Sequence, residues 1–498
     1  MKTGIVFPRP GVAANAVREA VLRVGIFFDG TGNNRTNSRI GNDCETLFFR
    51  KGSSHIKACG GRCADPVSSY HNDLTNIARL VELYRLQRRV ENTGDGLQAF
   101  RSIYVSGVGT RSGGRDCILS GMGLGRGSTG VLAKVGRAID KLEGVLRDFS
   151  DDNPDCFVGT LELDLFGFSR GAAAARHFAN QVLLGSQGEL GPVLERRRLS
   201  LAPGFSARHG DLRIKVIGLF DTVAAVGSLH DLGNVRDARN HDLHLYLPPG
   251  CAQQVLHLVA ADEQRRNFSL SSIQPGWSQE ILVPGTHSDV GGGYRPYMRE
   301  ELLLSRPRHS FVSLATSVEQ SPAWRAAATE LAGLDPRQWL DPSDPRGLLA
   351  VRWASQMSRS MPTLRRVSAA VGMERIVLGH LSRVYLRVMH ALACDEGVPF
   401  EPVPAGRAFA LTEELEPIAS KLVTYARGGA SGLSDDELAL LMRRYIHCSA
   451  HWNGLWGRSL AKGGAIYVHA PGLSTRCSHP NVPNVRRMRL HAPSTLWS

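Results

Sequence analysis

Short runs of apolar, β-forming residues recur through the N-terminal part of this 498-residue chain. Most are almost continuously apolar rather than alternating, which is typical of parallel strands covered on both faces. Helical patterns separate them, as in 128–149 and 169–183. The sequence therefore predicts an α/β fold with a mostly parallel central sheet. The expected strands lie at residues 21–30, 98–110, 160–169, 211–222 and 278–289.

The composition changes after about residue 300. Residues 301–445 are rich in Ala, Leu and Arg and contain no convincing buried strand, so a mainly helical insertion or cap is expected there. Ser434 and Glu437 have the spacing of a capping box that begins a helix. We predict an α/β catalytic core over 1–300, this insertion over 301–445, and a segment 446–498 that completes the catalytic domain.

Within the insertion, residues 373–394 predict one amphipathic helix. One stripe of that helix carries His380, Arg383, Arg387 and His390, and the apolar side chains lie largely elsewhere. A basic amphipathic helix can lie on a membrane surface or pack as a cap on a domain. The pattern alone leaves both possibilities open.

The net charge of +13, from 59 basic and 46 acidic residues, favours anionic partners. No zinc finger, RNA-recognition signature or basic-aromatic stripe accompanies it, so no nucleic-acid partner is expected. No apolar run approaches the length of about eighteen residues that a membrane-spanning helix needs. The first residues lack the apolar core of a secretory signal peptide.

The nine cysteines are an odd number scattered along the chain and do not resemble a disulfide framework. A metal site at His55, Cys59, Cys63 and His71 is conceivable, but the Cys spacing is unusual for zinc and the stretch reads as a glycine-rich loop. The glycine-rich stretch 121–130 lacks the Gly-Lys-Ser/Thr ending of a phosphate-binding loop. We expect neither a metal nor another cofactor.

The segment Gly167-Phe168-Ser169-Arg170-Gly171 fits the pattern Gly-x-Ser-x-Gly, directly after an expected strand and before an expected helix. In that context the pattern forms a tight turn that exposes a nucleophilic serine above the sheet. Small residues must flank the serine to avoid clashes, and the following helix N-terminus favours developing negative charge. Ser169 is therefore the candidate nucleophile, although close packing alone could also explain the glycines.

A serine nucleophile needs a general base and an acid that orients the base. Asp221 and His287 each follow an apolar run, in the chain order Ser, Asp, His. Asp221 could instead cap a helix, which would leave the acid's role to another aspartate. We expect Asp289 to organise the glycine turn at 291–293. The alternative acids are Asp231, Asp237 and Asp262.

An oxyanion hole should accompany the triad. One donor is expected to be the backbone N–H of Arg170, the residue after the nucleophile. The segment 27–34, "FFDGTGNN", could supply the second donor from Gly30 or Thr31. A nucleotide or calcium loop, or an Asx-rich turn, would give the same pattern.

Five motifs together resemble the catalytic domain of type VI secretion lipase effectors, which are bacterial phospholipases of the Gly-x-Ser-x-Gly class. They are "FFDGTGNN", "GVGT", "LFGFSRGAAAAR", "DTVAAVG" and "PGTHSDVGGGY", in this order over residues 21–295. The segments "HCSAHWN" (447–453) and "NVRRMRLH" (484–491) resemble the closing part of the same domain.

The resemblance implies an α/β-hydrolase fold whose triad maps to Ser169, Asp221 and His287. It implies hydrolysis of acyl esters in glycerophospholipid membranes after export from the cytoplasm without a signal peptide. Action would be in the periplasm or at the membrane of a rival bacterium, with a secretion spike or adaptor and a cognate immunity protein as partners. Family members carry a helical module that approaches the membrane, for which 373–394 is the candidate. A serine esterase for soluble esters and a non-catalytic binding protein on the same fold are the alternatives.

Overall fold

The computed structural model describes most of the chain, and the segments outside it carry several of the residues considered above. His55, Cys59, Cys63, Asp231, Asp237 and the segment 484–491 lie outside the described residues. No helix in the described part of the chain is long and apolar enough to cross a membrane. The described ranges are 18–51, 68–94, 96–116, 127–195, 199–207, 210–224, 243–358, 360–430, 432–454, 467–472 and 475–483.

A seven-stranded sheet runs through the centre of the described molecule, in the order β2-β3-β1-β4-β5-β6-β8. Every neighbouring pair is parallel except β2 with β3. The mostly parallel sheet predicted from the apolar runs is thus confirmed. Its strands are β1 (Arg18–Phe28), β2 (Gln87–Thr93), β3 (Gly96–Val105), β4 (Cys156–Phe168), β5 (Leu212–Phe220), β6 (Gln254–Ala260) and β8 (Glu280–Val283).

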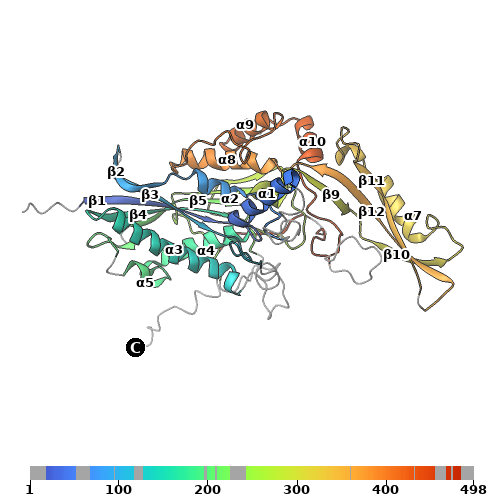
Figure 1. The fold of residues 1–498 in the computed structure, drawn as a ribbon, viewed down its shortest axis with the longest axis horizontal. Coiled ribbons are helices and arrows are strands. Elements are labelled where there is room, and N and C mark those ends of the chain that lie inside the picture. Colours follow the sequence, from blue (N-terminus) through green and yellow to red (C-terminus); the bar gives the residue numbers. More distant parts are fainter. Residues whose placement is uncertain are drawn as a thin grey trace, which may run out of the picture.

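Helices cover both faces of this sheet (Figure 1). One face packs against α3 (Val131–Asp152), α4 (Arg170–Leu184) and α5 (Gly191–Leu194), and the other against α2 (Asn76–Leu83), α8 (Leu381–Asp395) and α9 (Leu415–Ala426). Along β1, Ile26 and Phe28 belong to the first core and Phe27 belongs to the second. Both faces of the strand are buried, which explains the continuous apolar run.

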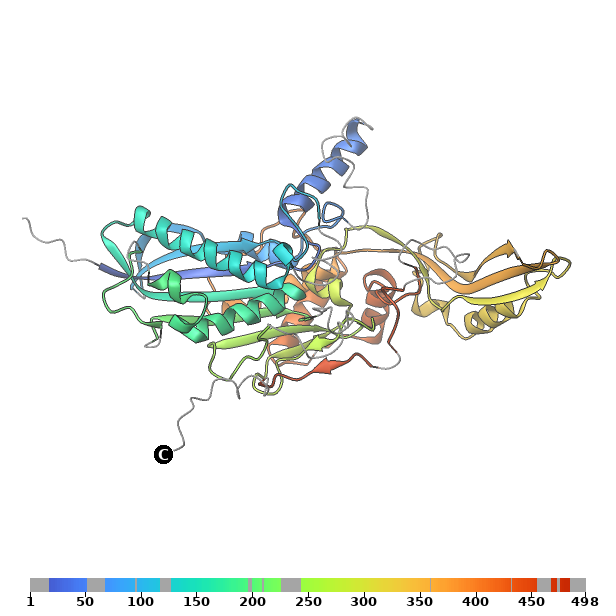
Figure 2. The ribbon, with the colours of Figure 1, turned by 90° about the horizontal axis from the view of Figure 1, so that it is seen from below.

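A second sheet extends away from the α/β core as an arm (Figures 1 and 2). It is antiparallel, and α7 (Pro322–Ala332) packs on one face through Ala323 and Ala327. The expectation of a mainly helical segment over 301–445 is therefore wrong for its first half. Its strands are β9 (Met298–Leu303), β10 (Arg308–Ser313), β11 (Leu348–Met357) and β12 (Leu364–Val377).

The predicted helix 373–394 is two elements in the structure. Residues 373–377 end β12, and α8 begins only at Leu381. The basic stripe turns inward: the guanidinium groups of Arg383 and Arg387 donate to the carbonyls of Ala410 and Phe409. Because these cations bind backbone carbonyls within the protein, helix α8 is a buried cap on the sheet and not a helix that lies on a membrane surface.

The remaining elements are short or peripheral. Helix α6 follows β8 closely and carries residues of the candidate site, and the capping box of Ser434 and Glu437 does begin α10. The small strands β7 and β13 pair in parallel and attach the C-terminal segment to the core. These elements are α1 (Arg35–Lys51), η4 (Gly127–Thr129), η5 (Gly185–Gln187), β7 (Leu270–Ser271), α6 (His287–Gly291), η8 (Pro336–Gln338), α10 (Asp435–Arg444) and β13 (Ser478–His479).

Candidate active site

Ser169 stands at the junction between β4 and α4 in a strained backbone conformation. Its φ of 59° and ψ of −126° lie in a region that L-residues rarely adopt and that costs about 1–3 kcal/mol. The turn is held because the Ser169 N–H donates to the carbonyl of Phe220 on β5 at 3.1 Å. A Cβ at Gly167 would lie 2.6 Å from the Ala172 Cα, and one at Gly171 would lie 2.3 Å from the Phe28 carbonyl oxygen. Steric clashes thus account for both flanking glycines.

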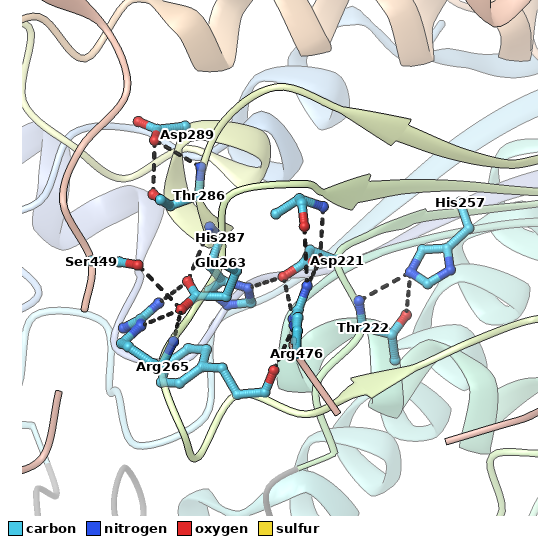
Figure 3. Close-up of polar contacts among 12 residues, drawn as sticks. Asp221, Thr222, His257, Glu263, Arg265, Thr286, His287, Asp289, Ser449 and Arg476 are labelled. Carbon is cyan, nitrogen blue, oxygen red and sulfur yellow. Dashed lines mark hydrogen bonds and ion pairs between the residues drawn. The ribbon is translucent and has the colours of Figure 1, made fainter. Parts of the chain in front are cut away.

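Asp221 and His287 meet at the same edge of the sheet, where β5 and β8 end. Asp221 has a φ of 41°, and its N–H donates to the carbonyl of Leu258 on β6 at 2.8 Å. His287 is the first residue of α6, and its Nδ1 lies 2.5 Å from Oδ2 of Asp221 (Figure 3). With the proton on Nδ1, the imidazole is held in the tautomer whose Nε2 can accept a proton.

Arg476 is the second charged partner of Asp221, and no pattern in the sequence points to it. Its Nη1 lies 2.6 Å from Oδ1 and its Nη2 lies 2.8 Å from Oδ2 of the carboxylate (Figure 3). The backbone N–H of Ala260 also donates to Oδ1, at 3.0 Å. The Arg476 and His287 partners outweigh burial and hold the pKa of Asp221 far below its usual range.

Two aromatic rings enclose the imidazole of His287. The ring of Phe168, directly before the serine, lies 4.7 Å from it, and that of Phe268 lies edge-on at 4.9 Å. Burial lowers the pKa of His287, although hydrogen bonding to Asp221 opposes that shift. A neutral imidazole beside an ionised carboxylate is the protonation state that a general base needs.

The loop after β1 packs against the serine turn. A Cβ at Gly30 would lie 2.3 Å from the Phe168 ring. The N–H of Gly30 donates to the carboxylate of Asp29 at 2.7 Å, so it is already used within the loop. Of the two residues predicted as the second oxyanion donor, Thr31 is therefore the better candidate. Burial raises the pKa of Asp29, which also accepts from Thr75 and Tyr104 at 2.6 Å each.

In the part of the chain that the structure describes, no group of three or more His, Cys, Asp or Glu side chains could hold a metal ion. Asp262, an alternative acid, accepts from the Gly285 N–H at 2.6 Å, whereas the His287 ring bonds Asp221. Among the described aspartates, Asp221 is thus the one positioned as the orienting acid.

Comparisons with known proteins point to one group of secreted effectors. Residues 200–315, which include Asp221 and His287, match the family model "T6SS, Phospholipase effector Tle1-like, catalytic domain". The chain is also similar to a solved structure described as the Tle1 effector bound to the VgrG spike from the Type 6 secretion system. That similarity has a TM-score of 0.70 and 29% identity, and it covers 96% of this chain and 97% of the other. The chain thus resembles the Tle1-like type VI secretion phospholipase effectors.

Other comparisons add little. An uncharacterized protein from Pseudomonas aeruginosa is similar over 86% of this chain and 53% of its own, with a TM-score of 0.36 and 20% identity. No curated protein sequence matches the chain significantly. The resemblance to Tle1-like effectors therefore rests on the family model and the Tle1 structure.

A second Asp–His pair lies beside the first in this Tle1-like chain. Asp289 accepts from Nδ1 of His447 at 2.7 Å and from the N–H of the same residue at 3.0 Å. Asp289 also accepts from the N–H and hydroxyl of Thr286, closing the capping box of α6 (Figure 3). Asp289 therefore organises the start of the helix and the attachment of "HCSAHWN", not chiefly the glycine turn.

Further buried polar residues support the strand ends. His257 on β6 accepts from the Thr222 N–H at 3.1 Å through Nε2, and its Nδ1 faces Glu280 at 2.9 Å. Glu263 accepts from Arg265 and from the His287 N–H at 3.3 Å. These contacts fix the backbone on either side of Asp221 and His287.

Proposed function

We propose that this protein is a serine phospholipase with an α/β-hydrolase fold, which hydrolyses acyl esters of membrane glycerophospholipids. The observation that carries the proposal is the 2.5 Å hydrogen bond between His287 and Asp221 at the sheet edge where the strained Ser169 turn lies. Similarity to phospholipase effectors supports a phospholipid substrate over a soluble ester.

The proposed reaction is acyl transfer through Ser169. Nε2 of His287 takes the hydroxyl proton as Oγ attacks the ester carbonyl carbon, and Asp221 stabilises the imidazolium. The tetrahedral intermediate collapses, the bond to the lysophospholipid oxygen breaks, and His287 returns the proton to that oxygen. Water then attacks the acyl-enzyme with His287 again as base, which releases the fatty acid and regenerates the serine.

The oxyanion would be held by backbone donors from the two loops that flank the serine turn. The N–H of Arg170 belongs to the first turn of α4, where helix geometry provides no acceptor within the helix. Thr31 supplies the second N–H, and its hydroxyl is buried with no hydrogen-bond partner among the described residues. Donors placed in this way are worth about 10²–10³-fold in kcat each.

The similar Tle1 structure supports a proposal for the biological setting. The Tle1 effector of the similar structure is bound to a VgrG spike. We propose that this chain, too, is made in the cytoplasm and delivered on a secretion spike or through an adaptor. It would act from the periplasm on the membrane of a target bacterium, and a cognate immunity protein would protect the producer.

Mass spectrometry of products from phospholipid vesicles tests the proposal. Wild-type protein should release free fatty acid and lysophospholipid, and Ser169→Ala should release neither. If vesicles stay intact while short soluble esters are cleaved, the phospholipase assignment is wrong and an esterase remains. If neither is cleaved, the fold serves a non-catalytic role.

A further inference from the structure

The carboxylate of Asp221 has more partners than a triad acid requires. Orienting the imidazole takes one oxygen, and Oδ2 bonds Nδ1 of His287 at 2.5 Å. The guanidinium of Arg476 binds both oxygens, at 2.6 and 2.8 Å. Planar arginine matches a carboxylate in two parallel hydrogen bonds, which fix the carboxylate's rotation as well as its place.

We propose that Arg476 is a positioning residue of the active site, which orients the carboxylate of Asp221 and offsets the negative charge that His287 meets. The inference rests on the proposed triad chemistry and adds to it a cation that tunes the basicity of His287 through Asp221. Arg476 does not reach the reacting atoms in this account. It acts through Asp221.

The same side chain also holds one wall of the imidazole site. Nε of Arg476 donates to the carbonyl of Phe268 at 2.7 Å, and the Phe268 ring lies edge-on to His287. Arg265 also stacks on this ring, with Cζ 3.3 Å from its centroid. One guanidinium therefore fixes both the acid and an aromatic contact of the base.

Backbone pairing sets the position of Arg476, so the contact does not depend on a free surface side chain. The N–H of Leu270 donates to the carbonyl of Cys477 at 2.9 Å, and β7 pairs with β13 directly after it. The Arg476 side chain is only 11% exposed. A segment 255 residues beyond Asp221 in sequence is thus built into the triad.

The charges around His287 determine the direction in which its pKa should move when Arg476 is replaced. Asp221, Glu263 and Arg265 face the imidazole directly, and Arg476 acts on it through Asp221 while also facing Glu263. Removing the Arg476 cation leaves the surroundings of the imidazole more negative. The imidazolium is then easier to form, so the base becomes protonated, and the enzyme inactive, at a higher pH.

The experiment compares Arg476→Gln with Arg476→Lys and with Arg337→Gln, whose side chain is 90% exposed on the arm. The readout is the rate of Ser169 labelling by a fluorophosphonate, and of p-nitrophenyl butyrate hydrolysis, between about pH 5 and 9. Arg476→Gln should react about 10–100-fold more slowly at alkaline pH. The acidic limb of its pH–rate profile should move to higher pH by about one unit. Arg476→Lys should keep the wild-type limb and recover part of the rate, and Arg337→Gln should behave as wild type.

Chemical rescue adds an independent readout. Arg476 lines a surface cavity of about 570 Å³ together with Glu263 and Leu270, which gives a small cation a route to the carboxylate. Guanidinium chloride should raise the labelling rate of Arg476→Ala several-fold over the same concentration of sodium chloride. It should not raise that of Arg337→Gln.

Two results would overturn the inference. One is a folded Arg476→Gln that keeps the wild-type labelling rate and the wild-type acidic limb of the pH–rate profile. The other is an equal loss of labelling rate in Arg476→Gln and Arg476→Lys, with the acidic limb unmoved in both and no rescue by guanidinium. That second result would indicate a structural role alone. If Gln and Ala variants do not fold, Arg476→Lys at the full wild-type rate overturns the positioning role. Absence of Ser169 labelling in wild type would instead refute the proposed function itself.

Discussion

Among the described residues, two buried Asp–His pairs lie side by side, and both involve the short helix α6. The His287 imidazole bonds Asp221 at 2.5 Å, and the His447 imidazole bonds Asp289 at 2.7 Å. The first acid also carries Arg476, whereas the second is satisfied by Thr286 and by the backbone of His447. Distance alone therefore does not distinguish a catalytic pair from a structural one.

The surroundings of the second ring nitrogen make the difference. The His287 ring is next to Phe168, which directly precedes the serine. The ring of His447 stacks on Tyr294 at 3.7 Å, and its Nε2 is buried with no partner among the described residues. We interpret His287 with Asp221 as a general base and its orienting acid. We interpret His447 with Asp289 as a structural contact that attaches "HCSAHWN" to the core.

The largest contrast should come from replacing each histidine. His287→Ala should lower kcat/KM by about 10⁴-fold with little change in Tm, because it removes the base of the triad. His447→Ala should instead lower the free energy of unfolding by about 2–3 kcal/mol, because it leaves Asp289 underbonded. Ester hydrolysis and thermal unfolding measured on both variants check this. A folded His447→Ala that loses activity as fully as His287→Ala would refute the division of roles.

Replacing the acids sharpens the same comparison. Asp221→Asn keeps the shape but loses the charge that supports the imidazolium, so kcat should fall by about 10⁴-fold. Asp289→Asn should cost about 1–3 kcal/mol of stability, because Thr286 and His447 donate to that carboxylate, with turnover changed far less. Near-normal turnover of Asp221→Asn in single-turnover kinetics would show that another residue is the acid.

The pH profile tests the first pair without mutation. Burial lowers the pKa of His287, so the neutral base persists below the ordinary imidazole value of about 6.5. Activity should therefore stay on its plateau through neutral pH and fall only at more acidic pH, as the imidazole gains a proton. A kcat/KM profile that already declines above pH 7 would contradict this environment for His287.

The smallest effect should come from moving the serine while leaving the Asp221–His287 pair intact. A Cβ in Gly171→Ala meets the carbonyls of Phe28 and Asp29 at 2.3 and 2.4 Å, so we expect a loss of about 1–3 kcal/mol and slower labelling of Ser169. Gly136→Ala in α3 is the matched control, since nothing lies within 4 Å of its Cβ, and it should be neutral or stabilising. Thermal unfolding and labelling rates that do not separate the two variants would refute the steric account of the elbow.

Local sequence signals predicted most of the core and suggested the proposed triad. Continuous apolar runs marked most central strands, and Ser169, Asp221 and His287 each follow such a run, which is why the sequence placed all three at the ends of strands. Strand β6 was missed, although its run "QVLHLVA" is equally apolar. The other strands could be predicted because a strand buried on both faces is apolar at nearly every position.

Long-range contacts could not be predicted in this way. Arg476 has no neighbouring motif, and its role depends on β13 pairing with β7. Strand β12 lies in the Ala-, Leu- and Arg-rich region that was expected to be mainly helical, but packing on α7 and on three neighbouring strands makes it extended. Tertiary packing overrides weak local propensity in such segments.

Site-specific labelling tests the central claim most directly, namely that Ser169 is the nucleophile activated by the Asp221–His287 pair. Intact-protein and peptide mass spectrometry after fluorophosphonate treatment should find one adduct, on Ser169, in wild type and in folded His447→Ala. Ser169→Ala should carry none, and His287→Ala should be labelled far more slowly. An adduct that persists in Ser169→Ala, or that lies on another residue in wild type, would contradict the account.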